Sequence, residues 1–466
     1  MGKYKYQLGT FNLFDYAGVE RHLEKMAAKG WRFDSVTNFW KFRKTEPAQL
    51  KYSVTYIPEA SDLDPEPLEK QKDIEAYCEE AGWKKVGSWM QMQIFCTDNP
   101  DAVPIETDEE LRLDVIRRSM NKNLLFSHGL LLLVFLMNMF TTFETAKRNW
   151  AEFLSDSHRL WNAGLWMWGI LILLIDIAFY LTWMLRAKNA VKAGRSCPEP
   201  KGYRYWNRFS WFGLAILVIG MFASYTSGMI LFMLLYLAGI LLIIFGVRKL
   251  QLKLKAEGVS KGGNMAATIL LCIFLTALLL GGFVAVIFSF DIRLTEKKEP
   301  SGTILVNGRE WNIYQDELPL YVNDFDVQQY SDSSCVAREQ ESFLVGYGDY
   351  EEYLFNGTEV TSVKVANTYE VITVKADFLY DFLLDAYYER EFRYWDEEDK
   401  KYVEFRVVYE NENGKVCRQY YNDGMEEAEL SHEWLFLTEN KIVPMTLYLD
   451  DLTEEQMGII LDKMGK

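Results

Sequence analysis

One carboxylate lies in the middle of a long apolar run, and it is the residue in this chain best placed to do chemistry. Asp176 follows Leu173-Leu174-Ile175 and precedes Ile177. A charged carboxylate at such a depth costs about 2.5–3.5 kcal/mol on insertion scales, so Asp176 should face protein and have a partner. By depth, Thr276 and Tyr236 are the expected polar partners. Two alternatives stay open, a proton or ion relay and a protonated acid bonded across helices; a relay needs a second ionisable group, for which His128 is the one candidate.

Polar clusters in the last third of the chain do not form a catalytic pattern. The acidic run at 396–399 lacks the spacing of a calcium loop, and Glu426, Glu427 and Glu429 are typical of a solvated turn. His432 is the one histidine of this region, so a zinc site or a Ser/His/Asp triad would have no companions. We therefore expect no enzyme activity, no metal and no cofactor.

Two of the six cysteines, Cys335 and Cys417, fall in the same C-terminal region. A bridge between them would close a loop of about 83 residues, which is worth about 4–5 kcal/mol in the chain-entropy model. The alternative is a pair of free thiols, and the sequence leaves both open.

Charge divides the chain into two contrasting parts. Residues 1–290 hold 33 basic and 27 acidic groups, whereas residues 291–466 hold 17 and 39. One uniform soluble domain is excluded, because the long apolar runs also fall before residue 290. Nucleic acid is not an expected partner, because the one large charge block is acidic.

Five apolar stretches approach or exceed the roughly 20 residues that cross a bilayer. They are residues 124–142, 163–185, 210–226, 228–247 and 266–290. About 16 Lys and Arg residues flank one side and six the other, which predicts a cytoplasmic N-terminus and, with an odd number of spans, an extracytoplasmic C-terminal region. Trp161, Trp166, Trp183, Trp206 and Trp211 are expected to anchor the spans at the lipid interfaces.

The first hundred residues repeat one pattern, strand–helix–strand–strand. Each helix is expected to end at a glycine followed by tryptophan, at Gly30 and again at Gly82. One unit would leave a bare sheet face that a second can cover, so residues 1–103 are expected to fold by themselves as a cytosolic α+β domain. By analogy with small-molecule-binding modules built from the same doubled unit, five aromatic residues would line a pocket. The alternative is that they are part of the core. They are Trp31, Phe39, Trp40, Trp83 and Trp89.

The Ala-Lys-Gly-Trp-Arg-Phe step at 28–33, the Phe-Trp-Lys-Phe strand at 39–42 and the Glu-Ala-Gly-Trp step at 80–83 resemble the bacterial family called domain of unknown function 2812. The resemblance covers about the first hundred residues. The resemblance implies a multi-pass membrane protein and makes a PadR-type regulator a candidate partner. It implies no activity and no catalytic residue. The strand at 89–95 departs from the family pattern, because it lacks an expected Asn-Trp near its start.

Residues 104–123 should form a juxtamembrane helix with a capping box from Thr107 to Glu110. Residues 291–466 alternate between strand patterns and short helices, with a hairpin at Asn413-Gly414, and predict an acidic extracytoplasmic α+β domain. The fold class is thus a multi-domain membrane protein: tandem β-α-β-β units, a five-helix transmembrane bundle and a second α+β domain.

These features favour a sensory or regulatory membrane protein that couples an outer or membrane event to a cytosolic binding domain. Its partners would be the lipid bilayer and a PadR-type regulator or a membrane protein. The alternative is an accessory of a membrane transport or resistance system that uses Asp176, although matching half-repeats typical of transporters are not evident.

Overall fold

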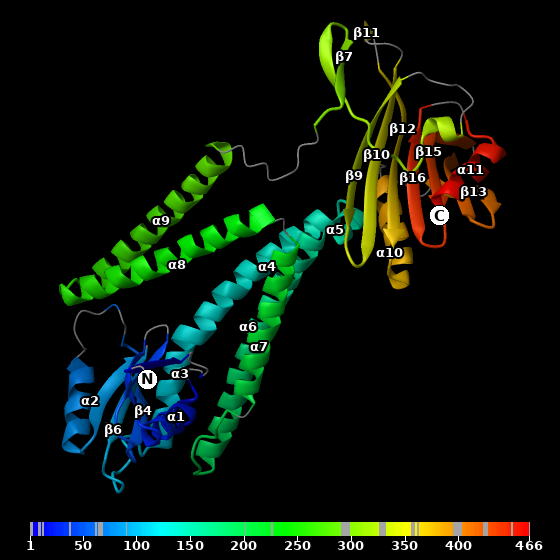
Figure 1. Cartoon of the computed structure of the whole chain (residues 1–466). Helices are drawn as coiled ribbons and strands as arrows, with labels where there is room; N and C mark the ends of the chain where they lie inside the picture. The colour runs from blue at the N-terminus through cyan, green and yellow to red at the C-terminus, as the bar shows by residue number, and fades with distance from the viewer. Residues whose placement is uncertain are drawn as a thin grey trace. The chain divides into compact units, whose positions relative to one another are not determined.

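The computed structural model describes residues 3–465 except for 8–10, 12–13, 37–38, 61–62, 64–68, 90, 201, 225–226, 290–298, 326–331, 356–358, 361–362, 395–402, 423–426 and 449–450. The chain divides into two compact units. The first unit comprises Met1–Asn138 and Leu165–Ile292, and the second comprises Met139–Gly164 and Arg293–Lys466. Both mix helices and strands (Figure 1).

The first unit begins with the repeated order that the sequence pattern predicts. The first copy consists of β1 (Tyr4–Gln7), α1 (Tyr16–Ala28), β2 (Trp31–Val36) and β3 (Trp40–Lys44), and the second of β4 (Lys51–Tyr56), α2 (Glu69–Glu80), β5 (Lys84–Trp89) and β6 (Met92–Thr97). Each copy forms a three-stranded antiparallel sheet with its last strand in the centre, β1-β3-β2 and β4-β6-β5. The matching topology supports an internal duplication.

Local sequence fixes the start of α1 and the ends of both helices in this repeat. Asp15 caps α1 by accepting a hydrogen bond from the backbone N–H of Gly18 at 3.1 Å. Gly30 and Gly82 follow the two helices with φ of 76° and 82°, the left-handed conformation that glycine adopts without steric cost. The prediction that both helices end at these glycines is confirmed.

Helices long enough to cross a membrane follow the repeat. They are α4 (Phe126–Ala146), α6 (Ser157–Lys192), α7 (Tyr203–Ala223), α8 (Ser227–Ala256) and α9 (Lys261–Ser289). Among the residues that the structure describes, five helices have the length and apolar composition of membrane spans, which indicates a multi-pass membrane protein and agrees with the five predicted apolar stretches. α6 is much longer than the predicted 163–185, with 36 residues. α3 (Glu109–Met120) continues through a π-helical segment, Asn121–Leu125, directly into α4.

The core of the first unit extends beyond the repeat. One cluster of buried side chains joins α1 and both sheets to Leu113, Ile116 and Met120 of α3, and to residues 180–187 of α6. The core that we expected to be complete by residue 103 therefore includes side chains from two later helices. The repeat by itself would leave apolar surface uncovered.

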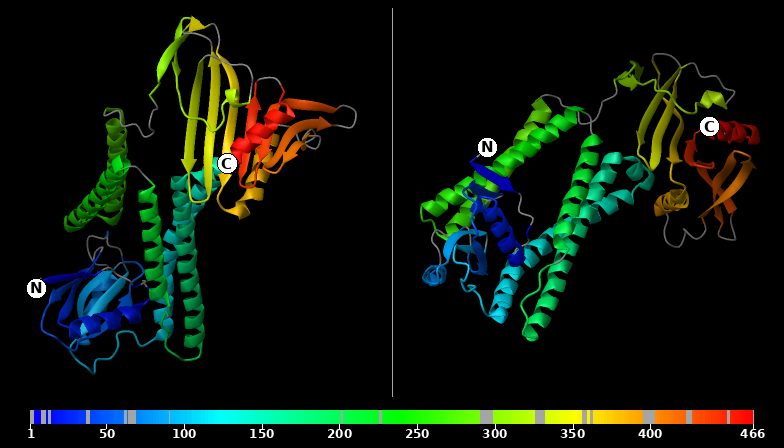
Figure 2. Two further views of the ribbon diagram at one scale, coloured as in Figure 1. Left: turned by 45° about the vertical axis from the view of Figure 1, so that its right-hand side comes forward. Right: turned by 60° about the horizontal axis from the view of Figure 1, so that its bottom comes forward.

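The second unit is built on a seven-stranded antiparallel sheet in the order β13-β14-β15-β16-β12-β10-β9 (Figure 2). The strands are β9 (Asp332–Glu341), β10 (Val345–Phe355), β12 (Lys364–Val374), β13 (Val403–Asn411), β14 (Gly414–Asn422), β15 (Glu427–Leu437) and β16 (Lys441–Leu447). A smaller sheet holds β7 (Gly302–Val306), β8 (Arg309–Ile313) and β11 (Glu359–Val360). The predicted hairpin is confirmed, because Asn411 pairs with Gly414 across the turn between β13 and β14.

Both faces of the large sheet are covered. α11 (Glu454–Met464) packs on one face through Ile460 and Leu461. α10 (Tyr380–Glu391) and the short α5 (Trp150–Ser155) pack on the other, where Ala151 joins a cluster with Ile372 and Leu383. Alternation along the strands explains the two clusters, since Val371 and Ile372 of β12 point to opposite faces.

Candidate functional site

The start of α3 sets the geometry of a highly connected polar site in the first unit. The N-cap is Asp108, whose carboxylate accepts from the N–H groups of Glu110 and Leu111 at 2.8 and 3.1 Å. The predicted capping box starting at Thr107 is therefore wrong by one residue. An aspartate is as good an N-cap as a hydroxyl residue, and its charge also suits the positive end of the helix dipole.

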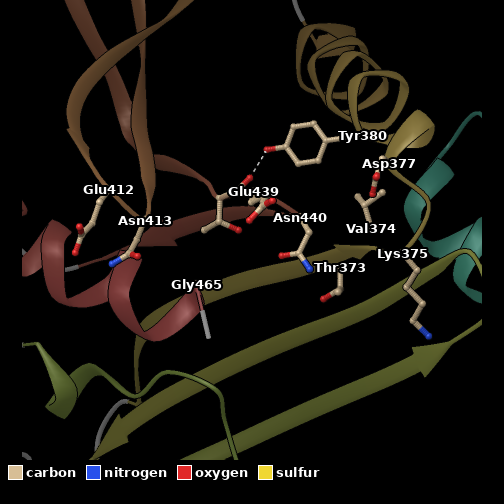
Figure 3. Close-up of a pocket in the computed structure, with 11 residues that line it drawn as sticks. Thr373, Val374, Lys375, Asp377, Tyr380, Glu412, Asn413, Glu439, Asn440 and Gly465 are labelled. Atoms are coloured by element: carbon tan, nitrogen blue, oxygen red, sulfur yellow. Dashed lines mark hydrogen bonds between the residues drawn. The ribbon is translucent and has the colours of Figure 1, made fainter.

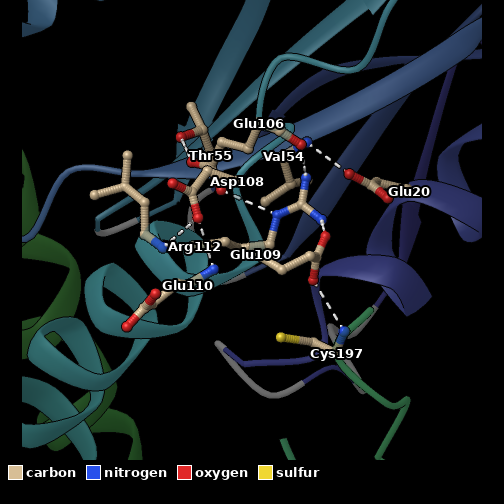
Figure 4. A network of polar contacts seen from close by, with 10 residues as sticks. Glu20, Val54, Thr55, Glu106, Asp108, Glu109, Glu110, Arg112 and Cys197 are labelled. Carbon is tan, nitrogen blue, oxygen red and sulfur yellow. Dashed lines mark hydrogen bonds and ion pairs between the residues drawn. The ribbon is translucent and has the colours of Figure 1, made fainter. Parts of the chain in front are cut away.

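Arg112 lies one turn into α3 and is the centre of this site (Figure 4). Its side chain is only 11% exposed. The guanidinium contacts Glu106 at 3.0 Å through Nε and Glu109 at 2.5 Å through Nη1, and lies 5.1 Å from the ring centroid of Tyr16. Such a buried cation with two carboxylates and an aromatic face is held in one geometry, and loss of Arg112 would leave the charges of Glu106 and Glu109 uncompensated.

Both carboxylates connect Arg112 to other elements. Glu106 accepts a short hydrogen bond from the hydroxyl of Thr55 on β4. Glu109 accepts from the backbone N–H of Cys197, in the segment after α6, at 2.9 Å. Figure 4 shows these links converging on Arg112 from three parts of the chain. The network therefore joins the repeat, α3 and the end of α6.

α1 protects the open edge of β4 beside this network. Strand β4 is the outer strand of its sheet, and Glu20 accepts from the N–H of Val54 at 2.8 Å. Burial raises the pKa of Glu20 to about 7, although the Val54 hydrogen bond and Arg112 both favour the charged form. Burial likewise raises the pKa of the Cys197 thiol to about 12. Glu20 is thus a titratable group near neutral pH at the contact between the two repeats.

The C-terminal part of α6 is built into the core of the repeat. Trp183 is fully buried, packs at 5.1 Å from the ring of Phe14, and donates its indole N–H to the carbonyl of Pro198 at 2.6 Å. Tyr180 and Ala187 are also buried in this cluster. The prediction that Trp183 anchors α6 in lipid is wrong, because protein covers the indole completely; Trp211 of α7, 63% exposed, remains a candidate anchor.

Arg112 and its two carboxylates fall within a segment that a known family describes, whereas Trp183 and Cys197 lie beyond it. Residues 15–128 match the family model of Protein of unknown function (DUF2812). The match confirms the resemblance and extends past residue 103 through α3 into the start of α4, so the family's segment includes Arg112 and its carboxylates. Searches of curated proteins and of solved structures found no significant match.

The aromatic residues proposed for a pocket in the DUF2812 segment do not come together around one cavity. Trp40 is 2% exposed and packs edge-on against Trp89 and Phe33, while Trp31 lies at the margin of the same core. Trp83 belongs to a separate small cluster with Cys78 and Phe95, and Phe39 is 44% exposed. Four of the five residues, all except Phe39, therefore lie in or against a hydrophobic core, as the alternative interpretation predicts.

Asp176 has two partners, and neither is one that depth suggested. Its carboxylate accepts from the indole N–H of Trp206 on α7 at 3.1 Å and lies 3.6 Å from Nε2 of His128 on α4. Depth suggested Thr276 and Tyr236, whereas the described contacts of Asp176 are with residues of α4 and α7. The second ionisable group that a relay needs lies beside it.

The polar candidates of the second unit fall largely in segments that the structure leaves undescribed. The acidic run 396–399 and Glu426 lie outside the described residues, as do the side chains of Glu427, Glu429 and His432. Among the residues that the structure describes, no group of three or more His, Cys, Asp and Glu side chains could hold a metal ion.

Cys335 and Cys417 are both free thiols. They lie on β9 and β14, which are separated by four strands of the large sheet. Strands lie about 4.8 Å apart, so a bridge between the two is out of reach, and the disulfide alternative does not fit the fold.

A cavity of about 950 Å³ in this unit opens at one end of the large sheet (Figure 3). Polar side chains such as Asp377, Asn413 and Asn440 line it. The hydroxyl of Tyr380 donates to the carbonyl of Thr438 at 3.0 Å. Lys375 instead directs its amine to Glu341 and to the carbonyl of Ser342. The described lining groups thus bond mainly to the fold around them, and no pairing of nucleophile and base is evident among them.

Sequence reasoning missed the Arg112 network. Arg112 counted only as one of the basic residues flanking a span, although Glu106 and Glu109 precede it at short spacing. The i,i+3 pair with Glu109 was a local signal that could have been used. The contacts to Tyr16, Thr55 and Cys197 come from distant parts of the chain and have no such signal.

Proposed function

We propose that the protein is a membrane sensor or regulator in which an outer or membrane event alters what the N-terminal DUF2812 segment binds. One observation carries the proposal: residues 180–187 of the membrane helix α6 lie in the core of this segment. A displacement or rotation of α6 would therefore change the packing of the repeat itself. A domain tethered by a flexible linker would be insulated from such a motion.

The other end of α6 supports the proposal. α6 begins at Ser157, directly after α5, and α5 is docked on the sheet of the second unit. Ser342 donates to the carbonyl of Leu154 at 2.6 Å, and Gln340 donates to the carbonyl of Glu152 at 2.9 Å. Covalent continuity along one 36-residue helix thus connects two well-packed anchor points.

In this proposal the N-terminal segment is cytoplasmic and the acidic second unit is extracytoplasmic, because the basic residues flanking the spans favour that orientation. The protein acts by binding, without catalysis. A PadR-type regulator, implied by the family resemblance, or a membrane protein would receive the signal.

The test disrupts the packing of α5 on the large sheet and measures hydrogen exchange in the N-terminal segment. Ala151 lies on the buried face of α5 and is 4% exposed, so Ala151→Trp should overpack the contact between α5 and the sheet. Arg148→Trp adds the same side chain at an exposed position nearby and serves as the control. Hydrogen–deuterium exchange of the full chain in nanodiscs should show altered protection of β4 and α3 in the first variant alone.

Retained protection of β12 and β16 would establish that the second unit is still folded in Ala151→Trp. Faster exchange in α5 with unchanged exchange in β4 and α3 would contradict the proposal, because the perturbation would then end at the second unit.

The second candidate function, an accessory of a membrane transport or resistance system, is favoured by one observation. His128 lies 3.6 Å from Asp176 and supplies the second ionisable group that a proton relay needs. Replacing the carboxylate by an amide separates the two functions, since an amide keeps the hydrogen bond but cannot titrate.

A further inference from the structure

One edge of the second unit exposes phenylalanine side chains that the proposed coupling does not use. Phe343 is 67% exposed, Phe378 is 78% exposed and Phe382 is 42% exposed. Isolated apolar residues on a surface need no explanation, but a group of large aromatics on one edge marks an interaction site.

These three residues belong to adjoining pieces of the fold. Phe343 lies in the turn between β9 and β10, and Phe378 lies where the chain passes from β12 into α10. The two pieces are bonded directly, because the N–H of Lys375 donates to the carbonyl of Leu344 at 3.0 Å. The amine of Lys375 also donates to the carbonyl of Ser342 at 2.7 Å.

The same edge adjoins the end of a membrane helix. Phe143 lies in the last turn of α4, and its ring is 5.8 Å from that of Trp150 on α5. The Trp150 ring is in turn 5.2 Å from that of Phe382. Because α5 connects the ends of two spans over a few residues, it must lie near the bilayer surface, and the aromatic edge is held beside it.

We propose that Phe343, Phe378 and Phe382 contact the headgroup and upper acyl region of the adjoining bilayer leaflet. A lipid surface is the occupant favoured by this position, since aromatic side chains collect at the interface where spans end. Lys147 and Arg148, exposed at the end of α4, would face the phosphates. The inference rests on α4 and α6 crossing the membrane; it depends neither on the proposed coupling nor on which leaflet is involved.

The opposite end of the same sheet supplies an internal control. Tyr448 is 47% exposed and directly follows β16, whose Leu447 pairs with Asn367 of β12. On the same two strands, Lys441 pairs with Thr373 near the aromatic edge. Tyr448 therefore lies seven positions along the chain from Lys441, a separation of roughly 24 Å at about 3.4 Å per residue.

The test places the photo-crosslinker p-benzoylphenylalanine at residue 343, 378 or 448 in the full chain. Each protein is reconstituted in nanodiscs of phosphatidylcholine and phosphatidylglycerol and irradiated, and adducts are mapped by mass spectrometry. Lipid adducts are expected at 343 and 378, with none above the unirradiated background at 448. Because these positions are exposed, the probe should not disturb folding.

Two outcomes would overturn the inference. Crosslinks from 343 or 378 to a second copy of the chain would show that the edge is a protein interface. Equal lipid labelling at all three positions, or none at any, would show that the aromatic edge has no preference for the bilayer.

Discussion

Truncation of Trp183 should destabilise the N-terminal DUF2812 segment strongly, although the residue is 80 positions beyond the repeat in sequence. The indole is fully buried, packs on Phe14 and donates to the carbonyl of Pro198. Removing a buried tryptophan costs about 3–5 kcal/mol, which is a large fraction of the stability of a small domain. Trp183→Phe keeps most of the packing and loses the hydrogen bond, so it should cost about 1–2 kcal/mol.

Hydrogen exchange of β4 and β6 in nanodiscs measures this effect. A loss of 3–5 kcal/mol corresponds to roughly two to nearly four orders of magnitude in exchange rate, since about 1.4 kcal/mol is a factor of ten. Trp211→Ala is the matched control, because Trp211 is 63% exposed on α7 and should change the exchange by less than about 0.5 kcal/mol. If Trp183→Ala and Trp211→Ala had the same small effect, α6 would not be part of this core.

Three further predictions address protonation and topology. Burial raises the pKa of Glu20 from 4.5 to about 7, so the folded state binds this proton more tightly than the unfolded state does. The free energy of unfolding should therefore fall by at most about 3 kcal/mol as the pH rises from 4.5 to 7. Glu20→Gln should remove that slope in pH-dependent melts. Asp176→Asn should leave abundance and regulation intact, because the amide oxygen still accepts from the indole N–H of Trp206. Asp176→Leu should lower the stability by about 1–2 kcal/mol or less. A folded, abundant but inactive Asp176→Asn protein would favour the transport function. In intact cells, an impermeant thiol reagent should label a cysteine at Asn413 and spare one at Lys70, and the reverse pattern would invert the topology.

Features set by neighbours in the sequence were predictable. The glycines at 30 and 82 end their helices because only a residue that tolerates positive φ fits there. The five spans follow from uninterrupted apolar length, and the hairpin at Asn413-Gly414 follows from its turn residues.

Features that depend on which helices meet were not predictable in the same way. Depth in the membrane suggested Thr276 and Tyr236 for Asp176, but depth does not say which helix is adjacent, and the partners are His128 and Trp206. Apolar length also cannot distinguish a side chain that faces lipid from one that faces protein, because both environments are nonpolar. For this reason the sequence predicts a lipid interface for Trp183, although the residue lies inside a protein core.

A double-mutant cycle between Ala151→Trp and Trp183→Ala tests the central claim most directly. Ala151 lies on the buried face of α5 in the second unit and Trp183 in the core of the first, and α6 is the covalent link between them. Stability of the N-terminal segment is measured by hydrogen exchange in the two single variants and the double variant. The account predicts an interaction energy of at least about 0.5 kcal/mol, whereas effects that add to within about 0.3 kcal/mol would show that the two ends of α6 are independent.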